Sequence, residues 1–328
     1  MSDEALRASA PRALLATAFA LLLGACRSEG RVAVAAATLE PTVAVVVADA
    51  EPSAPSPASP GDEPTLESLA GAAAEARAAP CPREPPLVIE SRADATDEEI
   101  QRMVADPRAR VASAVIGGPA RGALYGAIEL PESDAIQHAG GYAWGTANTV
   151  HAIERAVRQV RACFPDTPRL FVGDLSREHG GGLSPHASHQ AGLDADIGYF
   201  YRTPPLWYMR ATAQNLDVPR TRALVRALIE GGNIEMIFMD RSVQWLIRRQ
   251  KGESPGPDVP DDDWFESPLH RDALIRHAWG HATHLHARFK DADAVALGAR
   301  LVGLLPPLHP LRRLVPGAWK LAPTFASR

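Results

Sequence analysis

Two histidine-rich stretches far apart in the sequence constrain this chain more than any other feature. The first reads His186-Ala-Ser-His189-Gln-Ala-Gly-Leu-Asp194-Ala-Asp196-Ile197, and the second reads His281-Ala-Thr-His284-Leu-His286. Each neutral imidazole carries one hydrogen-bond donor and one acceptor, so packed imidazoles need polar partners. Histidines that gather beside carboxylates are typical of a bound metal ion, and we interpret the two stretches as parts of one metal site.

Both stretches contain the two-residue alternation of a β-strand. Asp194 and Asp196 share one face of the first strand, and His284, His286 and Arg288 share one face of the second. The apolar residues that alternate with them and can enter the core are Leu193, Ala195, Ile197, Leu285, Ala287 and Phe289. If the two strands are neighbours, Asp196 and His286 face one another across one pocket.

A third group, His189, lies on the loop that enters the first strand. Two imidazoles and one carboxylate leave the fourth position of a tetrahedral Zn2+ site open for water. That arrangement is typical of a catalytic zinc site, whereas structural zinc sites have four protein ligands.

These residues carry a family resemblance. His189 and Asp196, followed by His284-Leu-His286, are similar to the zinc pattern of the LAS group, which contains lysostaphin-type peptidases, D-Ala-D-Ala peptidases and the hedgehog domain. With Gly180-Gly181-Gly182 and the complete first stretch added, the pattern resembles the penicillin-insensitive murein endopeptidase (MepA) family. The resemblance extends over about residues 112–290.

The resemblance implies an α+β fold, in which a LAS-type central antiparallel sheet carries the zinc site and is flanked by helices and long loops. It implies one Zn2+ per chain, held by His189, Asp196 and His286. The glutamate base of D-Ala-D-Ala peptidases is replaced here by Thr283. We therefore expect His284, with His281 as its companion, to be the catalytic base or oxyanion partner.

Three further residues are candidates for the same pocket. His186 is expected to line it, with a second metal site as the alternative. Asp194 is expected to orient a histidine ligand by hydrogen bonding. Arg288 is expected to meet either a substrate carboxylate or a protein carboxylate in a salt bridge. The aromatic residues Tyr199, Tyr201 and Trp207 are expected in the cleft wall or in the core.

The function implied by the resemblance is a zinc metallo-endopeptidase that hydrolyses the D-alanyl–diaminopimelate cross-links of peptidoglycan with a zinc-activated water. Two alternatives stay open: a D,D- or L,D-carboxypeptidase of the same group, and a cell-wall binding module that keeps zinc without turnover. The net charge of −5 and the lack of a basic tract disfavour nucleic acid as a partner.

The N-terminal quarter of the sequence has features that predict export and lipidation. Residues 1–26 resemble a lipoprotein signal peptide, with an apolar run that ends in Leu23-Gly24-Ala25-Cys26. An ordinary secretory signal is the alternative. Residues 27–86 are rich in Ala, Pro, Glu and Ser, which predicts a disordered tether before a peptidase domain at residues 87–328. We expect a periplasmic protein anchored by Cys26, at the outer membrane by resemblance to other lipoproteins.

Two cysteines remain. Cys81 and Cys163 are an even pair in an oxidising compartment, so a disulfide between them is expected, with two free thiols as the alternative.

The remaining pattern gives a coarse map of secondary structure. Thr96-Asp-Glu-Glu99 is a capping box that predicts a helix through Val104. Residues 114–130 are predicted to be irregular, with one strand. Helices are predicted at 151–163, 220–230, 242–249, 269–279 and 291–305, and strands at 169–173 and 234–239.

Overall fold

The computed structural model describes residues 84–85, 92–106, 113–203, 207–249, 251–253 and 259–315. The chain divides into residues 1–63 and 64–328, and every described residue belongs to the second unit. Cys26, the signal and nearly all of the expected tether lie outside the described residues, so those assignments stay predictions. Within the described part, no helix is long and apolar enough to span a bilayer.

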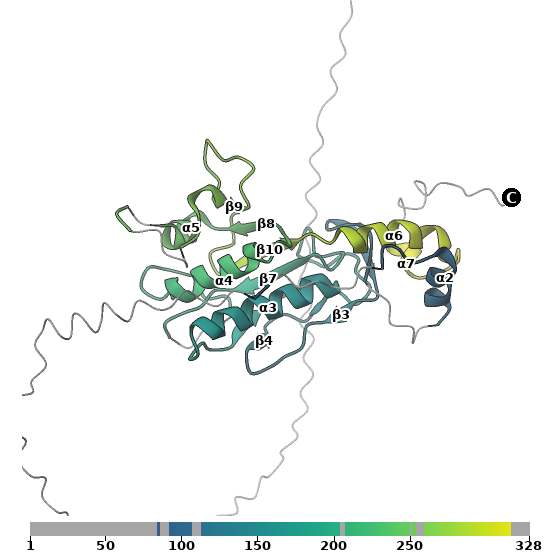
Figure 1. Ribbon diagram of the computed structural model, residues 1–328, viewed down its shortest axis with the longest axis horizontal. Coiled ribbons are helices and arrows are strands. Elements are labelled where there is room, and N and C mark those ends of the chain that lie inside the picture. Colours follow the sequence, from purple (N-terminus) through teal and green to yellow (C-terminus); the bar gives the residue numbers. More distant parts are fainter. Residues whose placement is uncertain are drawn as a thin grey trace, which may run out of the picture. The chain divides into compact units, whose positions relative to one another are not determined.

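A six-stranded sheet carries the residues of interest (Figure 1). Its order is β4 (Ile136–His138), β6 (Leu170–Val172), β7 (Asp194–Gly198), β10 (His284–Phe289), β8 (Ile234–Met239) and β9 (Ile275–His277). The inner pairs β6–β7, β7–β10 and β10–β8 are antiparallel, whereas the outer pairs β4–β6 and β8–β9 are parallel. The predicted α+β fold with a central antiparallel sheet is confirmed, and parallel strands extend it at both edges.

The two strands predicted from alternation are neighbours in this sheet. His286 lies opposite Asp196, and Arg288 lies opposite Asp194. The alternating residues Ala195, Ile197, Leu285 and Ala287 point to the other face and are completely buried. One face of β7 and β10 is therefore apolar and the other carries the polar groups.

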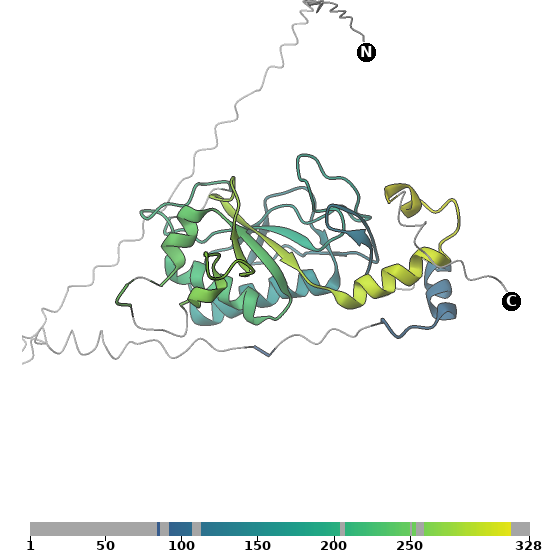
Figure 2. The same ribbon diagram turned by 90° about the horizontal axis from the view of Figure 1, so that it is seen from above.

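Two helices cover the apolar face. They are α3 (Ala147–Cys163) and α4 (Val218–Glu230), which lie side by side along the sheet (Figures 1 and 2). α3 begins four residues before the predicted start at 151, because the Thr146 hydroxyl caps it by accepting a hydrogen bond from the Thr149 N–H. With both helices on one face, the opposite face is left for the site.

A second, smaller core forms around a hairpin that the sequence analysis missed. Residues predicted to be irregular form β1 (Ala114–Gly118) and β2 (Arg121–Tyr125). Gly117 in the turn has φ +81°, and a Cβ there would lie 2.3 Å from the carbonyl oxygen of Arg121, so the turn requires glycine. A short pair, β3 (Ile128–Glu129) with β5 (Trp144–Gly145), follows it.

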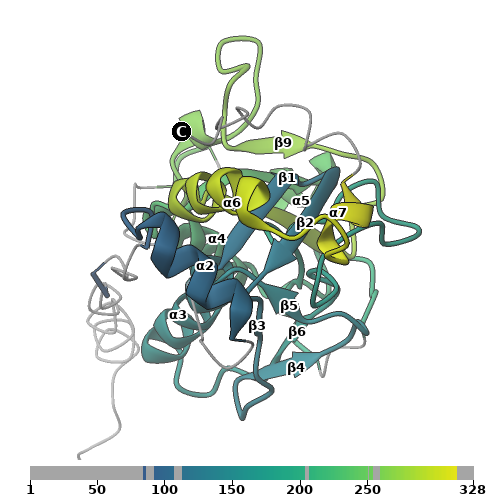
Figure 3. The same ribbon diagram turned by 90° about the vertical axis from the view of Figure 1, so that its right-hand side faces the viewer.

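Helices from both ends of the described region pack around this hairpin (Figure 3). They are α2 (Asp97–Ala105), α6 (Ala292–Leu304) and α7 (Leu311–Leu314). The capping box predicted for α2 is confirmed. Gly298 lets α6 approach β1 closely, since a Cβ there would lie 1.8 Å from the carbonyl oxygen of Val115. The residues after 290 therefore complete a core.

One predicted helix is wrong. Residues 269–279 form a turn and the short strand β9, followed by the loop that leads to His281. Leu269, the first residue of the predicted helix, is 89% exposed, whereas Ile275 is buried beside Ile237 of β8. The helix predicted at 242–249 is confirmed as α5 (Arg241–Ile247), and a 3-10 turn, η1, covers Asp262–Trp264.

Candidate metal centre

The polar face of β7 and β10 gathers four buried titratable side chains. Asp194 is 0% exposed and Asp196 is 3% exposed, while His284 and His286 are 5% and 7% exposed. Buried polar groups are costly unless they are paired. The partners of each group therefore show what this cluster is arranged to do.

His189 is held in one orientation by the loop that precedes β7. Its backbone is left-handed, with φ +65°, and its N–H donates to Asp194 Oδ2 at 3.0 Å. Its Nδ1 lies 2.7 Å from the carbonyl oxygen of Leu175. Because a carbonyl oxygen only accepts, Nδ1 carries the hydrogen and Nε2 presents its lone pair to the interior of the site.

Two further ligand atoms converge beside this nitrogen. His189 Nε2 lies 3.1 Å from His286 Nδ1 and 3.4 Å from Asp196 Oδ1. His286 Nδ1 lies 3.2 Å from Asp196 Oδ1. In a tetrahedral site with metal–nitrogen distances of about 2.0–2.1 Å, neighbouring ligand atoms are about 3.3–3.4 Å apart. Asp196 Oδ1 is also buried without a hydrogen-bond partner among the described residues, as a metal ligand would be in the absence of its ion.

Asp194 orients the second histidine of this triangle, as the sequence analysis expected. Its Oδ1 lies 3.1 Å from His286 Nε2, which turns Nδ1 toward Asp196. Burial disfavours a charged His286, but hydrogen bonds and charges of Asp194 and Asp196 outweigh burial and raise the pKa of His286 to about 9. Burial raises the pKa of both carboxyls, but nearby histidines outweigh it and lower both values: His286 does so for Asp194, and His189 and His286 do so for Asp196.

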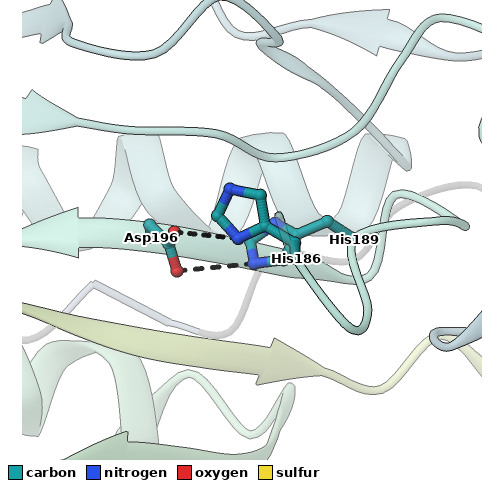
Figure 4. A group of neighbouring side chains, drawn as sticks. All are labelled: His186, His189 and Asp196. Atoms are coloured by element: carbon teal, nitrogen blue, oxygen red, sulfur yellow. Dashed lines mark ion pairs between the residues drawn. The ribbon is translucent and has the colours of Figure 1, made fainter. Parts of the chain in front are cut away.

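His186 borders the triangle from the solvent side. Its Nδ1 lies 3.7 Å from Asp196 Oδ2 (Figure 4). Its Nε2 lies 3.1 Å from Asp174 Oδ2. His186, His189 and Asp196 have ligand atoms within 4.8 Å of one another, so this group could also hold a metal ion. The distances to His286 are shorter, which favours His286 as the third ligand beside His189 and Asp196.

Asp174 is a site residue that the sequence analysis missed. Its Oδ1 accepts the Gly141 N–H at 3.0 Å, which fixes the carboxylate while Oδ2 faces His186. The only signal for it in the sequence is an acidic residue immediately after a predicted strand. Many loops share that feature, so the pairing with His186 becomes visible only in three dimensions.

The two histidines expected to move protons lie next to the triangle. His284 Nε2 is 3.7 Å from Asp196 Oδ1, and its Nδ1 is 2.9 Å from Thr283 Oγ1. Burial lowers the pKa of His284 to about 4, which leaves a neutral imidazole at pH 7. The ring centroid of His281 lies 5.1 Å from that of His284, and burial lowers the pKa of His281 as well.

The remaining site residues have clear places. Arg288 pairs with Asp194, with Nε at 2.7 Å from Oδ1. Tyr199 and Tyr201 are buried, and their hydroxyls donate to the carbonyls of His281 and Met209, so both belong to the core that supports the loop before β10. Trp207 lies beside the site, with its ring centroid 6.0 Å from that of His284.

Cys163, at the end of α3, is disulfide-bonded. Cys81 lies outside the described residues, so its pairing with Cys163 stays a prediction.

Comparisons with known proteins agree with the resemblance stated from these residues. Residues 115–250 match the family described as penicillin-insensitive murein endopeptidase. The chain is 28% identical over 200 residues to the penicillin-insensitive murein endopeptidase of Haemophilus influenzae, an alignment that covers 55% of this chain and 64% of that protein. The chain thus spans less than two thirds of the length of this curated relative. The predicted resemblance to the family is confirmed.

Proposed function

We propose that this chain is a zinc-dependent endopeptidase that hydrolyses the peptide cross-links of peptidoglycan, at the D-alanyl–diaminopimelate bond. The observation that carries the proposal is the triangle of His189 Nε2, Asp196 Oδ1 and His286 Nδ1, with edges of 3.1–3.4 Å. The name of the matched family supplies peptidoglycan as the substrate.

In this proposal His189, Asp196 and His286 hold one Zn2+. Two imidazoles and one carboxylate are a donor set that suits zinc. Three protein ligands leave one position for water or substrate. When bound, the ion polarises an amide carbonyl and lowers the pKa of a water molecule to about 7.

The protein's own proton carrier is His284. Its pKa of about 4 makes it neutral at physiological pH, so it can accept the proton that an attacking water releases. Thr283 Oγ1, bonded to Nδ1, fixes the ring so that Nε2 faces Asp196. In this proposal His284 returns that proton to the leaving amine, and His281, whose Nδ1 donates to the carbonyl oxygen of Trp279, is its companion.

Arg288 forms a salt bridge with a protein carboxylate, which was one of its two expected roles. A carboxypeptidase must recognise the free carboxylate next to the bond it cleaves, and Arg288 was the candidate for that role. Its guanidinium is occupied by two contacts with Asp194, at 2.7 and 3.4 Å.

We also propose that the site works in the periplasm, held to the outer membrane through lipid on Cys26. The support is the lipobox-like run before Cys26 and the Pro- and Ala-rich segment that follows it. A long tether of this kind would let the domain reach the cell wall.

Digestion of purified cross-linked peptidoglycan tests the proposed activity. The full-length zinc-loaded chain should convert cross-linked dimers to monomers, and a chelator should stop the conversion, with products identified by mass spectrometry. Monomers shortened by one residue would identify a carboxypeptidase. Unchanged muropeptides from folded, zinc-loaded protein would identify a binding module.

The pKa of His286 gives a prediction for metal affinity. Since metal binding must displace a proton from a residue whose pKa is about 9, the apparent zinc affinity should rise about tenfold per pH unit from pH 7 to pH 9 and level off above. Competition with a chelator of known pH dependence measures it. An affinity that does not change between pH 7 and pH 9 would exclude His286 as a ligand.

The raised pKa of His286 has the opposite consequence for the stability of the metal-free protein, which should fall as the pH rises. Because the folded-state pKa of His286 is raised above the ordinary 6.5, its protonated form stabilises the fold fully below about pH 6.5. That contribution is lost as the pH rises through about 9. Denaturant unfolding of the chelated protein at pH 6, 8 and 10 should therefore show a free energy of unfolding that falls as the pH rises.

A further inference from the structure

Tyr208 has a strained backbone beside the candidate site. Among the described residues, two that are not glycine have a left-handed backbone: His189, with φ +65°, and Tyr208, with φ +68°. A bulky residue seldom adopts this conformation, and such strain concentrates at functional sites. His189 lies at the centre of the site, so the same strain at Tyr208 points to a role in the same chemistry.

Trp207 anchors the strained residue. A Cβ on Gly173 would lie 2.6 Å from the indole of Trp207, and a Cβ on Gly198 would lie 3.5 Å from it, so the ring packs directly on the backbone of two glycines. The Tyr208 ring meets the Trp207 ring edge-on, with 5.3 Å between centroids. The position of the Tyr208 ring is therefore set by Trp207, which in turn packs on β7 and on the loop after β6.

The Tyr208 ring also lies against the proposed proton carrier. Its centroid is 5.3 Å from that of His284, yet 56% of the residue is exposed to solvent. A tyrosine held by core contacts alone would bury its ring and satisfy its hydroxyl, as Tyr199 and Tyr201 do. Among the described residues, the Tyr208 hydroxyl has no hydrogen-bond partner.

Burial, and after it the negative charges of Asp196 and Asp174, raises the pKa of Tyr208. The phenol is therefore neutral at physiological pH and keeps its hydrogen for donation.

We propose that Tyr208 is a catalytic residue that donates a hydrogen bond to the carbonyl oxygen of the scissile amide as negative charge develops on it. The inference rests on the proposed hydrolase function and adds a protein donor to it. Tyr208 keeps its proton throughout the reaction. Its hydrogen bond to the oxygen is released when the carbonyl is restored. Loss of one such donor lowers kcat by about 10²-fold in other hydrolases.

Tyr208→Phe tests the proposal, because it removes the hydroxyl and keeps the ring. With a soluble cross-linked muropeptide dimer as substrate, we expect kcat to fall about 10²-fold, with KM and zinc content close to those of the wild type. The control is Tyr125→Phe, whose hydroxyl donates to the Met103 carbonyl in the second core and whose loss should leave kcat unchanged. An unchanged kcat for Tyr208→Phe, or a rise in KM alone, would overturn the proposal.

A binding measurement separates this inference from the proposed function. A phosphinic pseudopeptide of the cross-link, which imitates the charged intermediate, should bind the zinc-loaded Tyr208→Phe variant about 10²-fold more weakly than the wild type by calorimetry. The wild type could bind the phosphinate but turn over no substrate. In that case, equal phosphinate affinities of the wild type and Tyr208→Phe would still reject Tyr208 as the donor. If the wild type neither turns over nor binds, both proposals fail.

Discussion

Replacing His286 by alanine should lower turnover of cross-linked peptidoglycan by at least about 10³-fold, because a catalytic metal supplies several kcal/mol of transition-state stabilisation. His286 Nδ1 is one of the three atoms in the triangle, at 3.1 and 3.2 Å from the other two. Zinc content, measured by atomic emission after gel filtration, should fall together with activity.

The fold should survive this substitution. Asp194 keeps the guanidinium of Arg288 at 2.7 Å and the backbone N–H of His189 at 3.0 Å when His286 is removed. The matched control is His151→Ala, which removes an imidazole with 42% side-chain exposure that pairs with Glu154 on α3. That variant should retain both zinc and activity.

The same experiment decides between the two possible third ligands. If the His286→Ala variant retains one zinc per chain and normal turnover, His186 is the third ligand beside His189 and Asp196. In that case His186→Ala should remove the metal. If zinc is lost only from the His286 variant, the shorter distances have identified the ligand correctly.

The part of this site that could be predicted from sequence is the part encoded locally. A strand points alternate side chains to opposite faces, so Asp196 and His286 could be placed on polar faces before their register was known. That register, with His286 opposite Asp196, is confirmed. The capping box at Thr96 and the helices α3 and α4 were likewise visible in short windows of sequence.

The errors concern structure that depends on distant partners. β1 packs against α6 and β2 packs against α7. Both helices follow the strands by most of the length of the domain, so residues 114–130 looked irregular on their own. Residues 269–279 have an apolar spacing that suits a helix, but β9 is fixed by parallel pairing with β8. Tyr208 was missed because its signal is a backbone angle, and no pattern of residue types encodes that angle.

Replacing Asp194 by alanine should destabilise the protein by about 3 kcal/mol, the lower end of the cost of breaking a buried ion pair. Asp194 is 0% exposed and accepts from the His189 backbone, His286 and Arg288, so its loss leaves three donors without their acceptor. The lower end applies because the Arg288 side chain is 19% exposed and can regain some hydration. For a domain of this size the midpoint of thermal unfolding should fall by about 6–12 °C.

Asp134→Ala is the matched control, since it also removes an aspartate that pairs with an arginine. Asp134 has an 83% exposed side chain and lies 2.8 Å from Arg161, and such surface pairs contribute at most about 1 kcal/mol. Zinc affinity should separate the two variants as well. Loss of the group that orients a histidine ligand typically lowers metal affinity about 10–100-fold. We expect a drop of roughly this size for Asp194→Ala and none for Asp134→Ala. If Asp194→Ala instead lowers stability without changing zinc affinity, Asp194 serves the fold and His286 does not depend on it to bind metal.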